Sequence, residues 1–541
     1  MHPVQLEYSI PDDTDPQTLA AAIQSHGPSL AESPRTLERR FLDNFDWSLY
    51  LAGAALEERH WPDDPEPARY QLLWHDLKQP AGSPIEQWCG SPAGMLDDLA
   101  PGPVRERLGP LIGIRRLLPV VTLRGRVHGH RLLNADDKTV VRIMVEDQTR
   151  LEAASPADPA AATKTPLSSR LRLQGVRGYE RELKAARTLI EDDLGLKPVE
   201  TPLLMEALAC TSLRPGSYSS KLDYQLDPTQ RADAATKCIL LDLLDTLEAN
   251  IDGTRSNLDS EFLHDLRVAT RRTRSALSQI KGVFADPLVD DYKTRFAWLQ
   301  QITGPVRDLD VYLLDFPHLR DSLPAPLRPH LDPLRDHILA HYDSTQSQLA
   351  AELAGGRFRT LLKDWRAFLE APVPEPPPAK PSNAGRSIKA VADARVWRMY
   401  HRVLDEGRAI RDDSPAEHLH ELRKSCKKLR YLLEFFQSLY PKDCVKELIK
   451  QLKELLDMLG RFQDQAVQAA HLRETAVEMH REGTGDIDTL LAMGALIGQL
   501  LSTQQQARGQ FAEVFAHFDN AANGERFEDC FRSKRKREGQ Q

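Results

Sequence analysis

The stretch HDLRVATRRTRSAL, His264–Leu277, places one histidine and four arginines within eleven residues, with a single aspartate among them. A closely similar stretch, HELRKSCKKLRYLL, follows at His420–Leu433. In both, leucines recur at the three- and four-residue spacing of a helix that buries one face. The pair therefore predicts two related amphipathic helices, each with one strongly basic face.

The similarity extends beyond the two helices. A shift of 156 places aligns the two copies without a gap over about 45 residues, which indicates a duplicated helical bundle. The matched pairs are His264/His420, Arg267/Arg423, Arg271/Lys427, Arg272/Lys428, Arg274/Arg430, Leu277/Leu433, Gly304/Gly460 and Asp308/Asp464.

The basic faces predict an anion-binding surface. At about 100° per residue, His264, Arg267, Arg271 and Arg274 share one arc of the helix, a stripe roughly 15 Å long. Each eleven-residue window holds one acid, outside the stripe, and uncompensated like charge destabilises a helix. Guanidinium groups suit phosphate oxygens, and a linear stripe suits a linear polyanion. Solvated helix faces are the ordinary alternative.

Bulk properties limit the class of protein. The chain has 541 residues, enough for two or three domains, and a formal net charge of −8. Its six cysteines are scattered without a CxxC pair, which is typical of a reducing cytosol rather than of a disulfide framework or a zinc site. No secretory leader or membrane-spanning run is evident, so we expect a soluble cytoplasmic protein without cofactor or metal.

The chain changes character near residue 200. Up to residue 205, short segments alternate like strands and predict a β-rich domain; VVTLRGRVHGHRLL is the clearest of them. Helical patterns follow, over a second domain at 216–530. A proline-rich linker at 371–385 divides that domain into repeats of about 222–370 and 386–525, and a basic tail follows at 531–541.

The helical region resembles the CHAD family (conserved histidine α-helical domain). H-x-x-R-x-x-x-R-R-x-R is followed by GPVRDLDV in the first copy and by LGRFQDQAV in the second, where Gln463 and Ala466 replace Arg307 and Asp310. The resemblance implies two antiparallel four-helix bundles around a basic groove that binds inorganic polyphosphate without turning it over. The implied binding residues are His264, Arg267, Arg271, Arg272, Arg274, Arg307, His420, Arg423, Lys424, Lys427, Lys428 and Arg430.

The first 205 residues resemble a degenerate CYTH domain, the triphosphate-tunnel barrel. The resemblance lies in RRFLDNFDWSLYLAGAALEER, Arg39–Arg59. Active members begin with E-x-E-x-K, whereas this chain has QLEYS, and Arg170 and Arg172 stand where paired carboxylates should hold magnesium. We expect a catalytically silent barrel. The strand face of Arg124, Arg126, His128 and His130 is open to two interpretations, an anion site or an ordinary solvent-facing surface.

Four rival functions remain open. A metal phosphohydrolase would use His264 and Asp265, but its further ligands are missing and four arginines would repel the cation. RNA or DNA binding lacks aromatic stacking residues in the stripes, and a residual CYTH activity on triphosphates lacks its motif. A scaffold for an acidic protein or a polyphosphate granule is the fourth. The sequence therefore favours a non-enzymatic polyphosphate-binding protein, with granules as a possible location and no membrane.

Overall fold

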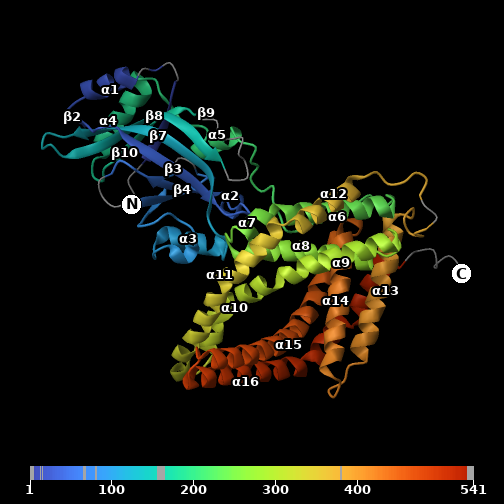
Figure 1. Cartoon of the computed structure of the whole chain (residues 1–541). Coiled ribbons are helices and arrows are strands. Elements are labelled where there is room, and N and C mark those ends of the chain that lie inside the picture. The colour runs from blue at the N-terminus through green and yellow to red at the C-terminus, as the bar shows by residue number, and fades with distance from the viewer. Residues whose placement is uncertain are drawn as a thin grey trace. The chain divides into compact units, whose positions relative to one another are not determined.

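The computed structural model describes residues 5–11, 14, 16–64, 69–79, 82–154, 165–377 and 380–532 (Figure 1). Its contacts divide the chain into two compact units between Ser219 and Ser220. Residues 533–541, which make up nearly all of the predicted basic tail, lie outside the described part.

The N-terminal unit is a curled antiparallel sheet, which confirms the β-rich domain expected there. Its strands run in the order β11-β1-β10-β8-β7-β3-β4-β5-β6, with β2 added to β7 and β9 to β8. The strands are β1 Gln5–Ile10, β2 Ser29–Ala31, β3 Arg35–Asp43, β4 Ala54–His60, β5 Tyr70–Asp76, β6 Ile85–Cys89, β7 Leu118–Leu133, β8 Thr139–Ala154, β9 Thr165–Pro166, β10 Ser169–Gly175 and β11 Lys197–Pro198. The helices are α1 Pro16–Ser25, α2 Ser48–Leu51, α3 Pro103–Ile112, α4 Glu180–Thr188 and α5 Leu203–Ala209.

The two faces of this sheet differ because side chains alternate along each strand. Tyr8 and Leu171 join an apolar cluster with Ile23 of α1 and Ala186 of α4. The neighbouring Glu7 lines a cavity of about 440 Å³ on the other face. One face is thus a helix-covered core and the other carries charge.

The C-terminal unit is built of helices joined by loops. Its helices are α6 Ala232–Ala249, α7 Ile251–Arg255, α8 Ser260–Gln279, α9 Asp286–Ile302, α10 Gly304–Ser322, α11 Asp332–Ala354, α12 Gly356–Glu370, α13 Ile388–Arg408, α14 Ala416–Phe436, α15 Lys442–Glu482, α16 Ile487–Gly509, α17 Phe511–Phe518 and α18 Ala521–Phe531. Cys444 and Cys530 form a disulfide between α15 and α18, a pairing that the cysteine spacing did not indicate.

The element boundaries repeat with the sequence. The shift of 156 places carries the first residues of α6, α8 and α9 onto the first residues of α13, α14 and α15. The long α15 corresponds to α9 and α10 joined end to end. The duplicated helical bundles expected from the sequence are therefore present.

The two repeats face each other about a pseudo-two-fold axis. Ala232 N donates to Arg386 O at 2.8 Å, and Ile388 N donates to Gln230 O at the same distance. Ile388 and Arg386 are the repeat-related positions of Ala232 and Gln230, so the contact is reciprocal. Reciprocal pairing is the mark of an isologous interface, here within one chain.

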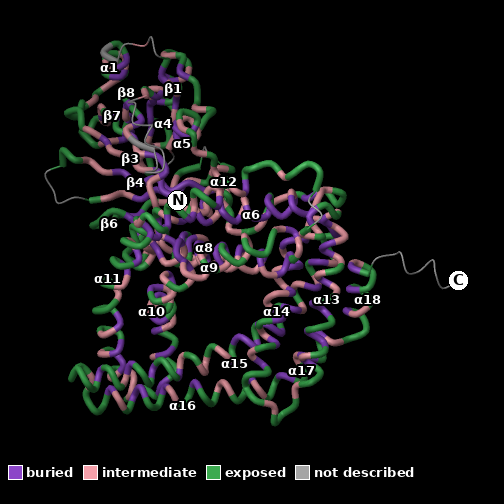
Figure 2. Tube along the Cα trace, turned by 45° about the vertical axis from the view of Figure 1, so that its right-hand side comes forward, coloured by how far each residue is buried: buried purple, intermediate pink, exposed green. Residues whose placement is uncertain are grey.

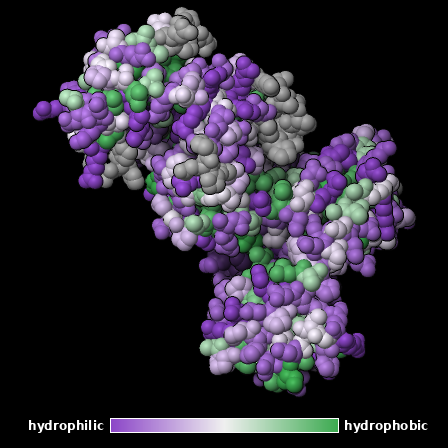
Figure 3. Space-filling model, turned by 60° about the vertical axis from the view of Figure 1, so that its left-hand side comes forward, coloured by the Kyte–Doolittle hydropathy of each residue, from purple (hydrophilic) through white to green (hydrophobic). Residues whose placement is uncertain are grey.

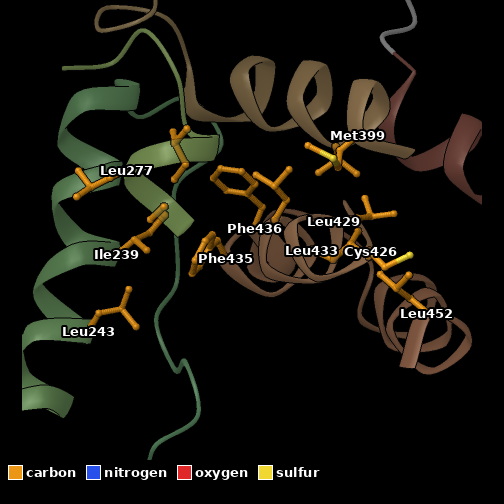
Figure 4. Close-up of a cluster of buried hydrophobic side chains, with 14 of the residues drawn as sticks. Ile239, Leu243, Leu277, Met399, Cys426, Leu429, Leu433, Phe435, Phe436 and Leu452 are labelled. Atoms are coloured by element: carbon orange, nitrogen blue, oxygen red, sulfur yellow. The ribbon is translucent and has the colours of Figure 1, made fainter. Parts of the chain in front are cut away.

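A single apolar core joins the repeats. Figure 4 shows Ile239 and Leu277 of the first repeat approaching Phe435 and Phe436 of the second, with Leu452 of α15 beyond them. Buried segments in Figure 2 run along the inward sides of α8, α13 and α14, while α16 is largely exposed. This core fixes α8 and α14 beside each other.

The face of the molecule drawn in Figure 3 is mainly polar. Figure 3 shows hydrophilic side chains over most of the visible face, with apolar ones scattered among them. Within the described residues, no helix is both long and apolar enough to cross a membrane.

Candidate functional site: a basic groove between the repeats

A groove of about 790 Å³ opens between α8, α14 and α15 of the C-terminal unit. Seven lysines and arginines and four carboxylates line it, so positive charge predominates. The lining residues are Ser220, Lys221, His264, Asp265, Val268, Arg271, Arg272, Arg423, Lys427, Arg430, Tyr431, Glu434, Leu456, Asp457, Gly460, Arg461, Asp464 and Gln465.

The first wall is α8. Asp259 caps its N-terminus, where the carboxylate accepts hydrogen bonds from Glu261 N and Phe262 N. Leu266 and Leu277 are buried in the core on the opposite face. This amphipathic pattern turns His264, Arg271 and Arg272 toward the groove.

Two arginines of α8 reach across to the second repeat. Arg271 Nε donates to the Tyr431 hydroxyl at 2.9 Å. Arg272 donates to Ser220 O at 2.8 Å and forms an ion pair with Glu434 at 3.2 Å. Arg271 remains without a carboxylate partner among the described residues, whereas Arg272 is neutralised.

The second wall is α14, packed against α15. Arg423 donates to both oxygens of Asp464 at 3.0 and 3.2 Å, so Asp464 orients an arginine. Arg430 Nε donates to Glu434 at 2.7 Å. Each of these guanidinium groups keeps further donors available for an anion.

Lys427 lies between these cations. Within the described part of the chain, its ammonium makes no hydrogen bond or ion pair. Burial lowers its pKa to about 8, and the positive charges of Arg423 and Arg271 act in the same direction. Asp464 opposes the shift without cancelling it. The groove thus holds a desolvated cation that an anion would stabilise.

The other predicted residues lie outside this groove. Arg267 donates to Gln300 O and Thr303 Oγ1 at the C-terminal end of α9, and burial lowers its pKa to about 10. His420 Nδ1 contacts Gln463 Oε1 at 3.1 Å, and Lys424 pairs with Glu421. The remaining members of this set are Arg274, Arg307 and Lys428.

Sequence reasoning missed part of the lining. Lys221 precedes the first predicted helix, and the repeat-related position of Arg461 is Pro305, so the repeat gave no signal for either. For Tyr431 the only signal in the sequence was its place in HELRKSCKKLRYLL, directly after Arg430. The expectation that acids would be absent from the basic surface was wrong, because it rested only on the two eleven-residue stretches that begin at His264 and His420. Asp265 lines the groove, and Glu434 enters from the last turn of α14.

The N-terminal cavity is charged but internally paired. Arg172 binds Glu7 at 3.1 Å, and Arg39 contacts both Glu57 and Glu146. Nearby, Arg170 binds Glu206 at 2.7 Å. These arginines face carboxylates of the sheet and of α5, so the carboxylates named here each have a cationic partner.

The basic face predicted on β7 is divided. Arg124 and Arg126 border a hollow of about 360 Å³ together with Asp63 and Glu152. His128 pairs with Asp147 at 3.2 Å, and His130 is buried, which lowers its pKa. The register shift at this point adds a residue to β8, where Arg124 pairs with Arg150 and Arg126 with Asp147, so the alternation of β7 itself continues.

The comparisons with known proteins bear on both units. Residues 238–473 match the family model of the CHAD domain. Similar solved structures include the CHAD domain from the plant Ricinus communis, with 23% identity, a TM-score of 0.46, and coverage of 55% of this chain and 94% of that one. PptA from Streptomyces chartreusis has 16% identity, a TM-score of 0.42, and coverage of 53% and 100%.

A third structure, HpAC1 from Hippeastrum, is described as an adenylyl cyclase candidate with dominant triphosphatase activity. It has 11% identity, a TM-score of 0.27, and coverage of 40% of this chain and 100% of that one. No curated protein matches the chain. The family model and the duplicated bundles lead to one conclusion: residues 238–473 of this chain form a CHAD domain.

Proposed function

We propose that the groove binds inorganic polyphosphate and holds it without chemical change. The observation that carries this proposal is the position of Lys427, a half-buried ammonium set among guanidinium groups of both repeats. Such a cluster costs free energy in the empty protein, and a dense linear anion removes that cost. Phosphate oxygens also match the unused donors of Arg271, Arg423 and Arg430.

The absence of turnover is part of the proposal. Hydrolysis of a phosphoanhydride needs a positioned nucleophile and a means of neutralising the leaving group, usually a metal held by carboxylates. The carboxylates Glu434 and Asp464 are already paired with arginines. Retention of the ligand would let the protein concentrate on polyphosphate granules.

The first test is binding of the full chain to long-chain polyphosphate across a salt series. We expect steep weakening with salt, because binding releases condensed counterions. RNA and DNA of matched charge are the competitors. Survival of the complex in their presence supports the proposal, whereas equal displacement makes the groove a general polyanion or nucleic-acid surface.

Lys427 has a matched control on the same helix. Lys427→Glu should weaken binding at least tenfold, about 1.4 kcal/mol, and Arg271→Glu with Lys427→Glu should abolish it. Lys424→Glu makes the same charge change outside the groove and should alter affinity less than about threefold, since exposed charges are well screened. Circular dichroism checks that each variant stays helical. Equal losses in both single variants would contradict a localised site.

A further inference from the structure

A histidine pair on α11 faces α15 in the C-terminal unit. His337 and His341 are four residues apart and therefore share one side of α11. They flank an apolar contact in which Ile338 of α11 packs in one cluster with Met479 of α15. Glu478 of α15 completes the group.

The donor atoms of these side chains converge. One ligand atom each from His337, His341 and Glu478 lies within 4.8 Å of the other two. His337 Nε2 is 4.0 Å from Glu478 Oε2, and the His337 side chain is only 7% exposed. The three groups come from two helices that are far apart in sequence.

The hydrogen bond of His341 fixes which of its nitrogens is available. Its Nδ1 lies 2.8 Å from His337 O. A carbonyl oxygen can only accept, so in the neutral ring Nδ1 carries the proton and Nε2 keeps its lone pair. A neutral imidazole with a free Nε2 is the form that binds a metal.

Glu482 supports His337 from the far side. Its carboxylate is 3.6 Å from His337 Nδ1, while Nε2 is the nitrogen nearer Glu478. A histidine that ligates through one nitrogen commonly directs the other N–H at a carboxylate, which orients the ring and raises its basicity. Glu482 stands in that position.

We propose that His337, His341 and Glu478 form a site for a divalent transition metal, Zn²⁺ first, with Glu482 as the residue that orients His337. Two imidazoles and one carboxylate suit zinc, whereas Mg²⁺ prefers oxygen donors alone. Zinc bonds of about 2.0–2.2 Å bring donors to about 3.4 Å apart. Glu478 is exposed and can supply the closing movement. Solvent fills the remaining coordination.

The ion would tie the two repeats together, because α11 belongs to the first and α15 to the second. It lies apart from the groove: Glu478 is fourteen residues beyond Asp464, about 21 Å along the helix. The repeat-related positions of the two histidines are Met493 and Ile497, so the shift of 156 places carries this histidine pair onto apolar side chains.

The test uses untagged full-length protein, stripped with a chelator and free of polyphosphate, which itself binds metals. Titration with Zn²⁺ against a chromophoric competitor should give one tight site. Zn²⁺ should also raise the unfolding temperature, because it binds only the folded arrangement. Mg²⁺ at the same concentration should do neither. A wild-type affinity weaker than millimolar, or stabilisation by both ions alike, would overturn the site.

Single substitutions distinguish the residues that would bind the metal from the residues around them. His341→Gln should lower Zn²⁺ affinity at least 100-fold and Glu482→Gln about 10- to 100-fold. His318→Gln, an exposed histidine of α10, is the matched control and should change nothing. Unchanged zinc binding by both His337→Gln and His341→Gln would refute the proposal.

The exposed thiols of Cys210 and Cys238 are the competing ligands. Co²⁺ distinguishes them, because thiolate ligation adds an intense charge-transfer band that imidazole and carboxylate lack. A Co²⁺ spectrum dominated by that band would place the ion elsewhere and count against the histidine site.

Discussion

Lys427 and its repeat-related residue Arg271 show how one position acquires two roles. Both lie on the groove, yet Arg271 donates to Tyr431 while Lys427 is left among cations. An ammonium can lose its proton to relieve this repulsion, and a guanidinium cannot. The second repeat therefore carries a titratable charge where the first carries a permanent one.

The depressed pKa of Lys427 predicts that polyphosphate binding takes up a proton. The free protein begins to lose this charge near pH 8, and the bound anion restores the pKa toward its ordinary value. Affinity at constant ionic strength should thus fall as the pH rises from about 7.5 to 9.5. Lys427→Arg should flatten that profile, because arginine stays charged. An equally steep profile in the variant would assign the proton to another group.

Lys427 also affects stability, with a sign that can be stated. Its folded pKa lies below its unfolded pKa, so folding disfavours the charged form. The cost is fully present below about pH 8 and disappears as the pH rises toward the unfolded value. From this residue alone, the folded protein gains stability over that interval.

The helices of the C-terminal unit show what the sequence could and could not predict. Leucine spacing and the 156-place repeat gave the helices, their amphipathic faces and their duplication. They did not give the choice between Arg267 and Arg272 as groove residues: Arg267 lies inside the predicted basic arc, yet Arg272, which lies outside it, lines the groove. The guanidinium of Arg267 donates to Gln300 O and Thr303 Oγ1 at the C-terminal end of α9. These hydrogen bonds hold it outside the groove.

Close helix contacts depend on glycine at identifiable places, of which Gly407 is one. A Cβ on Gly407 of α13 would lie 2.0 Å from the Phe515 ring of α17, and Phe515 is buried. Gly498 of α16 has no such neighbour within 4 Å. Replacing each of these two glycines by alanine therefore separates the effect of packing on stability from the effect of helix propensity.

We expect Gly407→Ala to destabilise the helical unit by about 1–3 kcal/mol, because the ring must shift within a packed core. Gly498→Ala should stabilise it by up to about 1 kcal/mol, the ordinary advantage of alanine in an exposed helix. Denaturant midpoints followed by circular dichroism measure both. A stabilising Gly407→Ala would mean that α13 and α17 pack less closely than described.

At the scale of the whole molecule, the two units divide the charge differently. In the N-terminal cavity the arginines and carboxylates pair with each other, as Arg39 does with Glu57 and Glu146. In the groove between the repeats, Lys427 and Arg271 have no carboxylate partner among the described residues. The sequence indicated the charged residues of both units but not which of them are paired, since ion pairs between distant strands leave no local sequence pattern.

This division predicts that polyphosphate binding resides in the C-terminal unit alone. A fragment beginning at residue 212 keeps Ser220 and Lys221 and the whole groove. Its affinity and salt dependence should equal those of the full chain within about threefold. A loss of affinity by tenfold or more, with the helical content intact, would show that the N-terminal unit contributes to the ligand site.

The groove departs from the pseudo-two-fold axis, and this has a consequence for the direction of the ligand. Arg461 and Asp464 of α15 line the groove, whereas their repeat-related residues Pro305 and Asp308 do not. A polymer with distinct 5′ and 3′ ends meets different side chains in its two senses, so the unequal walls select one of them. A phosphate chain reads the same from either end, so both senses give one and the same complex and the unequal walls impose no direction on it.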